Sequence, residues 1–166
     1  MSRLEDDAVQ LALSLELPDH AHVPGVNARH HNELLESVIA MASPITSNNG
    51  WRENPTWLYG IRLFNQGFFW EAHEVLERVW MNARPNSRER HLVQGVVQLA
   101  NARLKEVAGR TKAAERLFAI AGQCFERTFA GGVESLMGIS AGELASQAGT
   151  TGKTGKRVQQ LSDCAV

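Results

Sequence analysis

The feature that most constrains this chain is the segment LFNQGFFWEAHEVLERVW, which runs from Leu63 to Trp80. Gly67 suits the end of a helix, because glycine adopts the left-handed backbone conformation at little steric cost. Beyond the aromatic residues that follow it, apolar residues recur at the spacing of a helix. The segment therefore predicts the end of one helix, a tight turn, and a second helix that starts at about Phe69.

The same turn pattern occurs a second time. In GFFWEA, residues 67–72, and in GRTKAA, residues 109–114, an alanine stands five residues after a glycine. A helical hairpin needs a glycine for its tight turn and a small residue where its two helices approach closely. This spacing also resembles the turn inside tetratricopeptide repeats, but the two copies do not follow the repeat length of about 34 residues. We therefore predict two stacked αα-hairpins and not a peptide-binding repeat array.

Helix start and stop signals divide the rest of the chain. Asn54 and Pro55 suit the N-cap and the first position of a helix, and Ser140 with Glu143 resembles a capping box. No segment alternates well enough to predict a strand. The fold is predicted to be all-α, a compact helical bundle of stacked αα-hairpins with about six helices and no sheet. The main helices are expected at residues 4–17, 29–42, 54–66, 69–82, 87–108 and 111–130.

Polar stretches that contain proline or glycine divide the chain into three predicted parts. Residues 1–53 are expected to form a helical N-terminal extension with a loop that contains histidine and proline. Residues 54–137 are expected to form a helical core domain, and residues 138–166 a short helix with a flexible C-terminal tail. The histidines in or beside this loop are expected to be flexible and solvated, with a loop metal site as the alternative: His20, His22, His30 and His31.

Composition argues against several classes of partner. Hydrophobic residues make up 43% of the chain, charged residues 21%, and the net charge is −1, which does not favour nucleic acid as an obligatory partner. No apolar run approaches the roughly 18 residues of a membrane helix, and the acidic N-terminus does not resemble a signal peptide. We therefore predict a cytoplasmic protein without a membrane partner. The basic residues considered for nucleic acid are interleaved with acidic ones: Arg84, Arg88, Arg90, Arg103, Lys105 and Arg110.

A candidate site lies on the border of the helix predicted over residues 69–82. On a helical wheel of ~100° per residue, the apolar residues form one broad sector with His73 at its edge. Glu77 lies beside His73 one turn later, whereas Glu71 and Glu74 are expected to point toward solvent or another subunit. An imidazole and a carboxylate four residues apart can bind a divalent metal, act as a general acid and base, or simply stabilise the helix.

Further ligands for such a site would have to come from another helix. HEVLE lacks the second histidine of the HExxH zinc motif, and Trp70 stands where a Glu-x-x-His motif would need glutamate. The helix predicted over residues 87–108 offers a row of amides, Gln94, Gln98 and Asn101. Amides are poor metal ligands but good hydrogen-bond partners of a buried histidine or carboxylate. The row is either part of the site or a solvated face.

From Leu63 to about Phe118, about a third of the chain, the sequence resembles the bacterial, archaeal and plastid family called domain of unknown function 309. The resemblance rests on the core FNxGxxxEAHExxExxW at residues 64–80 and on Arg90, Gln94, Gly95, Gln98, Leu99, Ala100, Gly109, Ala113 and Ala114. It implies a compact helical bundle but no particular reaction. It also implies that His73, Glu74, Glu77 and Trp80 form one unit with Gln94 and Gln98.

The first functional hypothesis is a polar site at His73 and Glu77, supported by Asn65, Gln94 and Gln98. This site would bind a small molecule or a divalent metal, with His73 and Glu77 as the metal ligands. Hydrolytic or acid/base chemistry fits such a site, but the residues identify neither a reaction nor a cofactor.

The second hypothesis is a non-catalytic interaction or oligomerisation module. In that case the His/Glu pair is structural and the hairpins form a scaffold, which is compatible with a homo-oligomer. Its contact residues would be Trp57 and Trp70, which are expected to be exposed.

Overall fold

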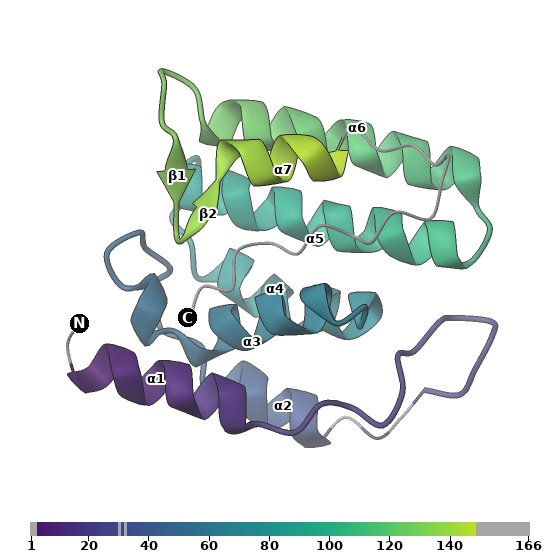
Figure 1. The fold of residues 1–166 in the computed structure, drawn as a ribbon, viewed down its shortest axis with the longest axis horizontal. Coiled ribbons are helices and arrows are strands. Elements are labelled where there is room, and N and C mark those ends of the chain that lie inside the picture. Colours follow the sequence, from purple (N-terminus) through teal and green to yellow (C-terminus); the bar gives the residue numbers. More distant parts are fainter. Residues whose placement is uncertain (1–2, 30, 32, 149–166) are drawn as a thin grey trace.

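The computed structural model describes residues 3–29, 31 and 33–148 and shows helices stacked in layers (Figure 1). One layer holds α1 and α2, the next holds the hairpin of α3 and α4, and the third holds the hairpin of α5 and α6 with α7 against it. The predicted C-terminal tail lies outside the described residues. The helices are α1 (Arg3–Ser14), α2 (Glu33–Ala40), the short 3-10 helix η1 (Trp51–Glu53), α3 (Pro55–Asn65), α4 (Phe69–Met81), α5 (Arg88–Val107), α6 (Thr111–Thr128) and α7 (Ala141–Ala148).

The prediction of a helical bundle is confirmed, and within the described part of the chain it contains seven α-helices. The expectation of no sheet is wrong, because β1 (Ser135–Leu136) and β2 (Ile139–Ser140) pair antiparallel with Leu136 opposite Ile139. Their two-residue turn has positive φ at both Met137 (47°) and Gly138 (78°), as a tight hairpin turn requires.

Tertiary contacts hold Met137 in this uncommon conformation. Its side chain is fully buried, and its backbone N–H donates to the Asn48 Oδ1 atom at 2.7 Å. Its carbonyl accepts a hydrogen bond from the Trp57 indole N–H at 3.3 Å. A methionine at φ > 0 is rarely a turn signal in sequence, which is why the hairpin could not be predicted.

The two predicted helical hairpins close with the same hydrogen bonds. After α3, Gly67 N–H donates to the Phe64 carbonyl at 3.1 Å and Phe68 N–H to the Leu63 carbonyl at 2.9 Å. The turn after α5 repeats these bonds 42 residues later. Gly109 N–H donates to the Glu106 carbonyl at 2.9 Å, and Arg110 N–H donates to the Lys105 carbonyl at 2.8 Å. Both turns are Schellman motifs, and both glycines have positive φ. The repeated turn is therefore confirmed at the level of individual bonds.

The N-terminal segment is bound to the first hairpin by backbone acceptors. The Tyr59 hydroxyl donates to the Glu16 carbonyl at 2.7 Å. The Arg62 guanidinium donates to the carbonyls of Ala12 and Leu15 at 3.0 and 2.7 Å. These carbonyls belong to the last turn of α1 and the residues after it, so Arg62 satisfies acceptors that the helix itself leaves unpaired.

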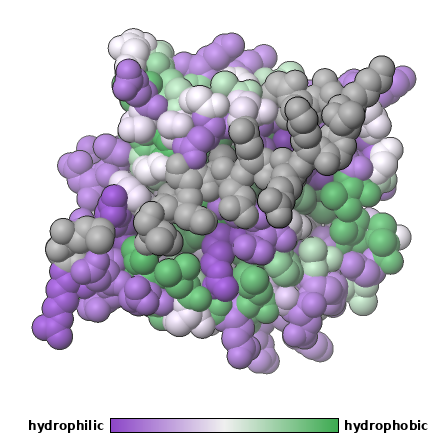
Figure 2. Space-filling view, in the orientation of Figure 1, coloured by the Kyte–Doolittle hydropathy of each residue, from purple (hydrophilic) through white to green (hydrophobic). Residues whose placement is uncertain are grey.

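The surface carries its apolar residues in separate patches. Figure 2 shows them scattered among hydrophilic residues on the face in view, and not as one continuous band. Isolated exposed apolar side chains are normal in globular proteins. Among the described helices, none is both long and apolar enough to cross a membrane. The large apolar side chains that are exposed are Leu4, Leu11, Leu13, Val26, Met41, Ile45, Met81 and Val107.

The capping box predicted at Ser140 is confirmed at the start of α7. The Ser140 backbone N–H and hydroxyl both donate to Glu143 Oε2 at 2.7 Å, and Glu143 N–H donates back to the Ser140 hydroxyl at 3.3 Å. Ser140→Ala is expected to lower the free energy of unfolding by about 1 kcal/mol, because the N-cap acceptor is lost. Urea denaturation checks this value. The same Ser→Ala change at Ser146, on the exposed side of α7, serves as control and should cost less; equal losses would contradict the capping role.

Candidate functional site

A pocket of about 200 Å³ lies between α4 and α5, which pack against each other. Since a short turn joins α4 to α5, the two helices run in opposite directions and bring residues far apart in sequence to the same cleft. Five of the residues that sequence analysis singled out line this pocket. The full lining is His73, Glu77, Trp80, Gln94, Val97 and Gln98.

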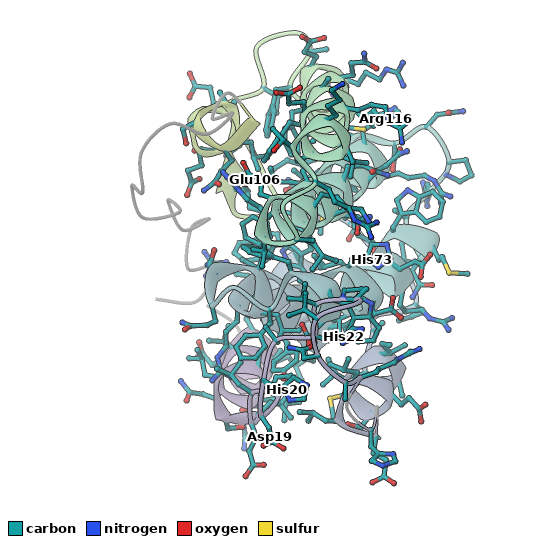
Figure 3. All side chains as sticks on the ribbon, turned by 90° about the vertical axis from the view of Figure 1, so that its right-hand side faces the viewer. Asp19, His20, His22, His73, Glu106 and Arg116 are labelled. Carbon is teal, nitrogen blue, oxygen red and sulfur yellow. The ribbon has the colours of Figure 1, made fainter. Side chains whose placement is uncertain are left out.

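His73 sits at the border between the two helical hairpins, as Figure 3 shows from the side. Its Nδ1 atom lies 3.2 Å from Glu74 Oε1, and the two side chains are 25% and 32% exposed. The expected partner, Glu77, lines the pocket with an exposed side chain, but the recorded ion pair of His73 is with Glu74. Glu74 is half-exposed and is not part of the pocket lining, but its carboxylate lies against the His73 ring. If Nδ1 donates to the Glu74 carboxylate, Nε2 is left as the basic nitrogen of the ring.

Trp80 is held firmly in the pocket wall. The Arg90 guanidinium lies 4.1 Å from the centre of its ring. Arg90 also donates to the Trp80 carbonyl at 3.2 Å and to the Ala83 carbonyl at 2.9 Å, so a cation–π contact and two hydrogen bonds act together. The indole Nε1 of Trp80 is buried, and the described part of the chain provides no acceptor for it. A buried donor without an acceptor costs about 1–3 kcal/mol.

Asn65 does not line the pocket. It is the last residue of α3 and is half-buried. Asn65 of the FNxGxxxEAHExxExxW core therefore lies at the end of this helix, beside the Schellman turn. The geometry therefore separates Asn65 from the other candidate site residues. The remaining amide of the predicted row, Asn101, is half-buried one turn beyond Gln98 and is likewise outside the pocket lining.

The donors around His73 do not form a metal site by themselves. Within residues 3–29, 31 and 33–148, no group of three or more His, Cys, Asp or Glu side chains is arranged to hold a metal ion. Protein metal sites generally use at least three protein ligands when they bind tightly. The amides of Gln94 and Gln98, which complete the pocket, are better suited to hydrogen bonds than to metal coordination.

Sequence reasoning missed a buried carboxylate on the opposite border of α4. Glu71 is 0% exposed, and its Oε1 accepts a hydrogen bond from the backbone N–H of His22 at 2.7 Å. The expectation that Glu71 points to solvent is wrong because the N-terminal loop covers that side of the helix. Burial raises the pKa of Tyr59 to about 12; Arg62 opposes this shift, and the nearby charge of Glu71 adds to it.

The N-terminal loop is ordered against α4, contrary to the expectation of solvated histidines. His22 is 9% exposed, and its ring packs edge-on against Trp70 with centroids 4.9 Å apart. Asn27 ties the loop together, since its Oδ1 accepts from the Val23 N–H at 2.9 Å and its Nδ2 donates to the Ala21 carbonyl at 2.9 Å. The sequence signal was the turn-forming Val-Pro-Gly at residues 23–25, with Asn27 two residues after its glycine. His20, in contrast, is exposed, although its Nε2 lies 2.8 Å from the Ala28 carbonyl; His30 lies outside the described residues.

The tryptophans proposed as exposed contact residues are not free surface residues. Trp57 is 0% exposed and Trp70 is half-buried beneath the N-terminal loop, with the Arg29 guanidinium 4.8 Å from the centre of its ring. The prediction of an exposed Trp57 is wrong because the β1–β2 hairpin packs against α3 at this residue, where the Trp57 indole donates to the Met137 carbonyl. Helix α3 also packs against α4. The interaction-module hypothesis loses the residues on which it was based.

Three of the arginines considered for nucleic acid have structural partners. Arg88 donates to the Thr128 and Ala130 carbonyls at 2.8 and 2.6 Å, and Arg90 holds Trp80 as described above. Arg103 pairs with Glu106 at 2.8 Å and donates to the Gln147 side chain at 3.0 Å. These guanidinium groups connect helices, and this use explains their presence without a phosphate backbone as partner.

Comparison with known protein families gives a match to part of the chain. Residues 57–117 match a family described as Domain of unknown function (DUF309). No curated protein and no solved structure matches the chain significantly. The matched residues begin in α3 and end in α6, so they include both Schellman turns and every residue that lines the pocket between α4 and α5. The chain is therefore similar to the DUF309 family over residues 57–117, the segment that contains both helical hairpins.

Proposed function

We propose that this protein binds a small organic molecule in the pocket between α4 and α5. The observation that carries the proposal is the convergence of His73, Glu77 and Trp80 from one helix with Gln94 and Gln98 from the next. A cleft lined by an aromatic ring and a few convergent polar groups is the usual form of a ligand site. The volume of about 200 Å³ lies below the range of roughly 300–1,000 Å³ for drug-sized ligands, so the ligand would be a small metabolite or one end of a larger one.

The donor set favours an organic ligand over a metal ion. His73 and Glu77 would supply two donors, and the other polar groups that line the pocket are an indole and two amides. A planar organic molecule could use all of these groups through stacking and hydrogen bonds. The imidazole, held by Glu74, is also placed as a general acid or base would be, but the proposal is one of binding.

A ligand screen on a pocket-filling variant tests the proposal. We expect wild-type protein to bind one or more members of a library of small polar metabolites, detected by ligand-observed NMR. Gln98→Phe should weaken that binding at least ~10-fold, which corresponds to about 1.4 kcal/mol, because the larger ring occupies the pocket.

Gln123→Phe is the matched control. Gln123 is exposed on α6, so the same substitution there should leave binding unchanged. A ligand that binds Gln98→Phe as well as wild type, or a library without any ligand for wild type, would refute the pocket as the binding site. Titration of the same proteins with Zn²⁺ alone separates the metal hypothesis, which requires stoichiometric binding that His73→Ala abolishes.

A further inference from the structure

The charges around the pocket indicate what kind of ligand it takes. Glu77 is the carboxylate in the lining, and the lining contains neither lysine nor arginine. A second carboxylate, Glu74, lies beside His73 at 3.2 Å. Arg90 contacts the lining residue Trp80, and its guanidinium is engaged with that ring and with two backbone carbonyls. An anionic ligand would therefore meet negative charge, which opposes its binding.

The two glutamines suit a group that both donates and accepts hydrogen bonds. Gln94 and Gln98 lie one turn apart on the same side of α5, and both are half-buried. Each amide offers two N–H donors and a carbonyl acceptor. Neither amide is held by a recorded side-chain hydrogen bond, although both line the pocket. A paired arrangement of this kind complements the edge of another amide or of a ureido group.

Trp80 adds a donor that requires an acceptor. Its Nε1 is shielded from water and lacks an acceptor among the described residues, while its ring forms part of the pocket wall. An acceptor in the pocket reaches this buried N–H only after the side chains that shield it move aside. A carbonyl oxygen there would recover part of the free energy that the buried donor costs.

Given the proposed binding function, we infer that the ligand is neutral or cationic and carries an amide or ureido group. Its carbonyl oxygen accepts from the Trp80 indole N–H and from a glutamine amide. Its N–H groups donate to the Glu77 carboxylate and to a glutamine carbonyl. The charge of Glu77 and the absence of lysine and arginine from the lining disfavour small carboxylates and inorganic phosphate.

NMR of the tryptophan indole N–H groups tests this inference. N-methylurea and acetamide are the amide probes, and acetate and inorganic phosphate are the anionic probes, each titrated to tens of millimolar because fragments of this size bind weakly. The titrations are run at about pH 8, where imidazole side chains are generally neutral. The Trp80 signal is assigned with Trp80→Phe. The Trp57 signal is the internal reference, because that N–H already donates to the Met137 carbonyl.

We expect N-methylurea and acetamide to shift the Trp80 signal saturably and to leave the Trp57 signal in place, whereas acetate and phosphate shift neither. Glu77→Lys, at an exposed position, should weaken N-methylurea at least fivefold and allow acetate to shift the Trp80 signal. The matched control is Glu126→Lys, which makes the same charge change at an exposed position on α6 and should alter neither titration.

Two results would overturn the ligand class. One is saturable binding of acetate or phosphate to wild type with a Trp80 shift; the other is a Trp80 signal that no amide probe moves. In either case, library ligands that Gln98→Phe weakens would show that the pocket still binds small molecules. Failure of the ligand class is thereby distinguished from failure of the binding site itself.

Discussion

Trp57→Ala is expected to lower the free energy of unfolding by about 3–5 kcal/mol, the range for removal of a buried aromatic side chain. The Trp57 side chain is completely buried, so the truncation leaves a cavity that the surrounding helices can fill only in part. The substitution also removes the indole N–H that donates to the Met137 carbonyl at 3.3 Å. Because that carbonyl is in the β1–β2 turn, we expect the C-terminal hairpin and α7 to loosen before the rest of the bundle.

Urea denaturation followed by circular dichroism measures the loss, and amide hydrogen exchange at residues 135–147 reports on the hairpin. Trp57→Phe is the matched control, since it keeps an aromatic ring but not the N–H, and it should cost clearly less than the alanine. Trp70→Ala, at a half-buried position, should also cost less. A loss below 1 kcal/mol for Trp57→Ala would show that this side chain is not in the core.

Gly95→Ala is expected to destabilise the protein by about 2 kcal/mol, although alanine is the better helix former by about 1 kcal/mol. The α5 backbone at Gly95 packs directly on the Phe125 ring of α6, and a Cβ atom at residue 95 would overlap that ring. Relief requires either a displaced aromatic ring in a close-packed core or a shift of α5 relative to α6, and such overpacking costs about 1–3 kcal/mol or more. Gly60 has the same role between α3 and α4, where its missing Cβ leaves room for Leu76.

Gly122→Ala provides the comparison within the same hairpin. Gly122 is also inside a helix, but nothing lies within 4 Å of the position its Cβ would take. Because no overlap opposes it there, the higher helix propensity of alanine should raise the free energy of unfolding by up to ~1 kcal/mol. A double-mutant cycle of Gly95→Ala with Phe125→Leu should show favourable coupling, because the smaller side chain relieves the overlap. A Gly95→Ala protein as stable as wild type, or an absence of coupling, would contradict the close approach of α5 and α6.

The local features were predictable because their bonds join residues close in sequence. The bonds of the Schellman turns at Gly67 and Gly109 join residues three and five positions apart, and those of the capping box at Ser140 join residues three positions apart. The helical period alone placed His73, Glu77 and Trp80 on one border of α4. The pocket is built from that border and from the Gln94 and Gln98 row on α5.

Features that depend on distant segments were decided only by the tertiary structure. Glu71 has the same charge as Glu77 and lies on the same helix, yet it is buried because the backbone of His22, 49 residues earlier, donates to it. Trp57 and Met137 are 80 residues apart in sequence and contact each other in the fold. This contact contributes to the burial of Trp57 and holds Met137 at positive φ. Helical periodicity determines which residues share a face, whereas burial depends on which other segment covers that face. The sequence by itself therefore determined the hairpins and the residues that border the pocket, and the tertiary packing decided which of the flanking charges and aromatic rings remain accessible to a ligand.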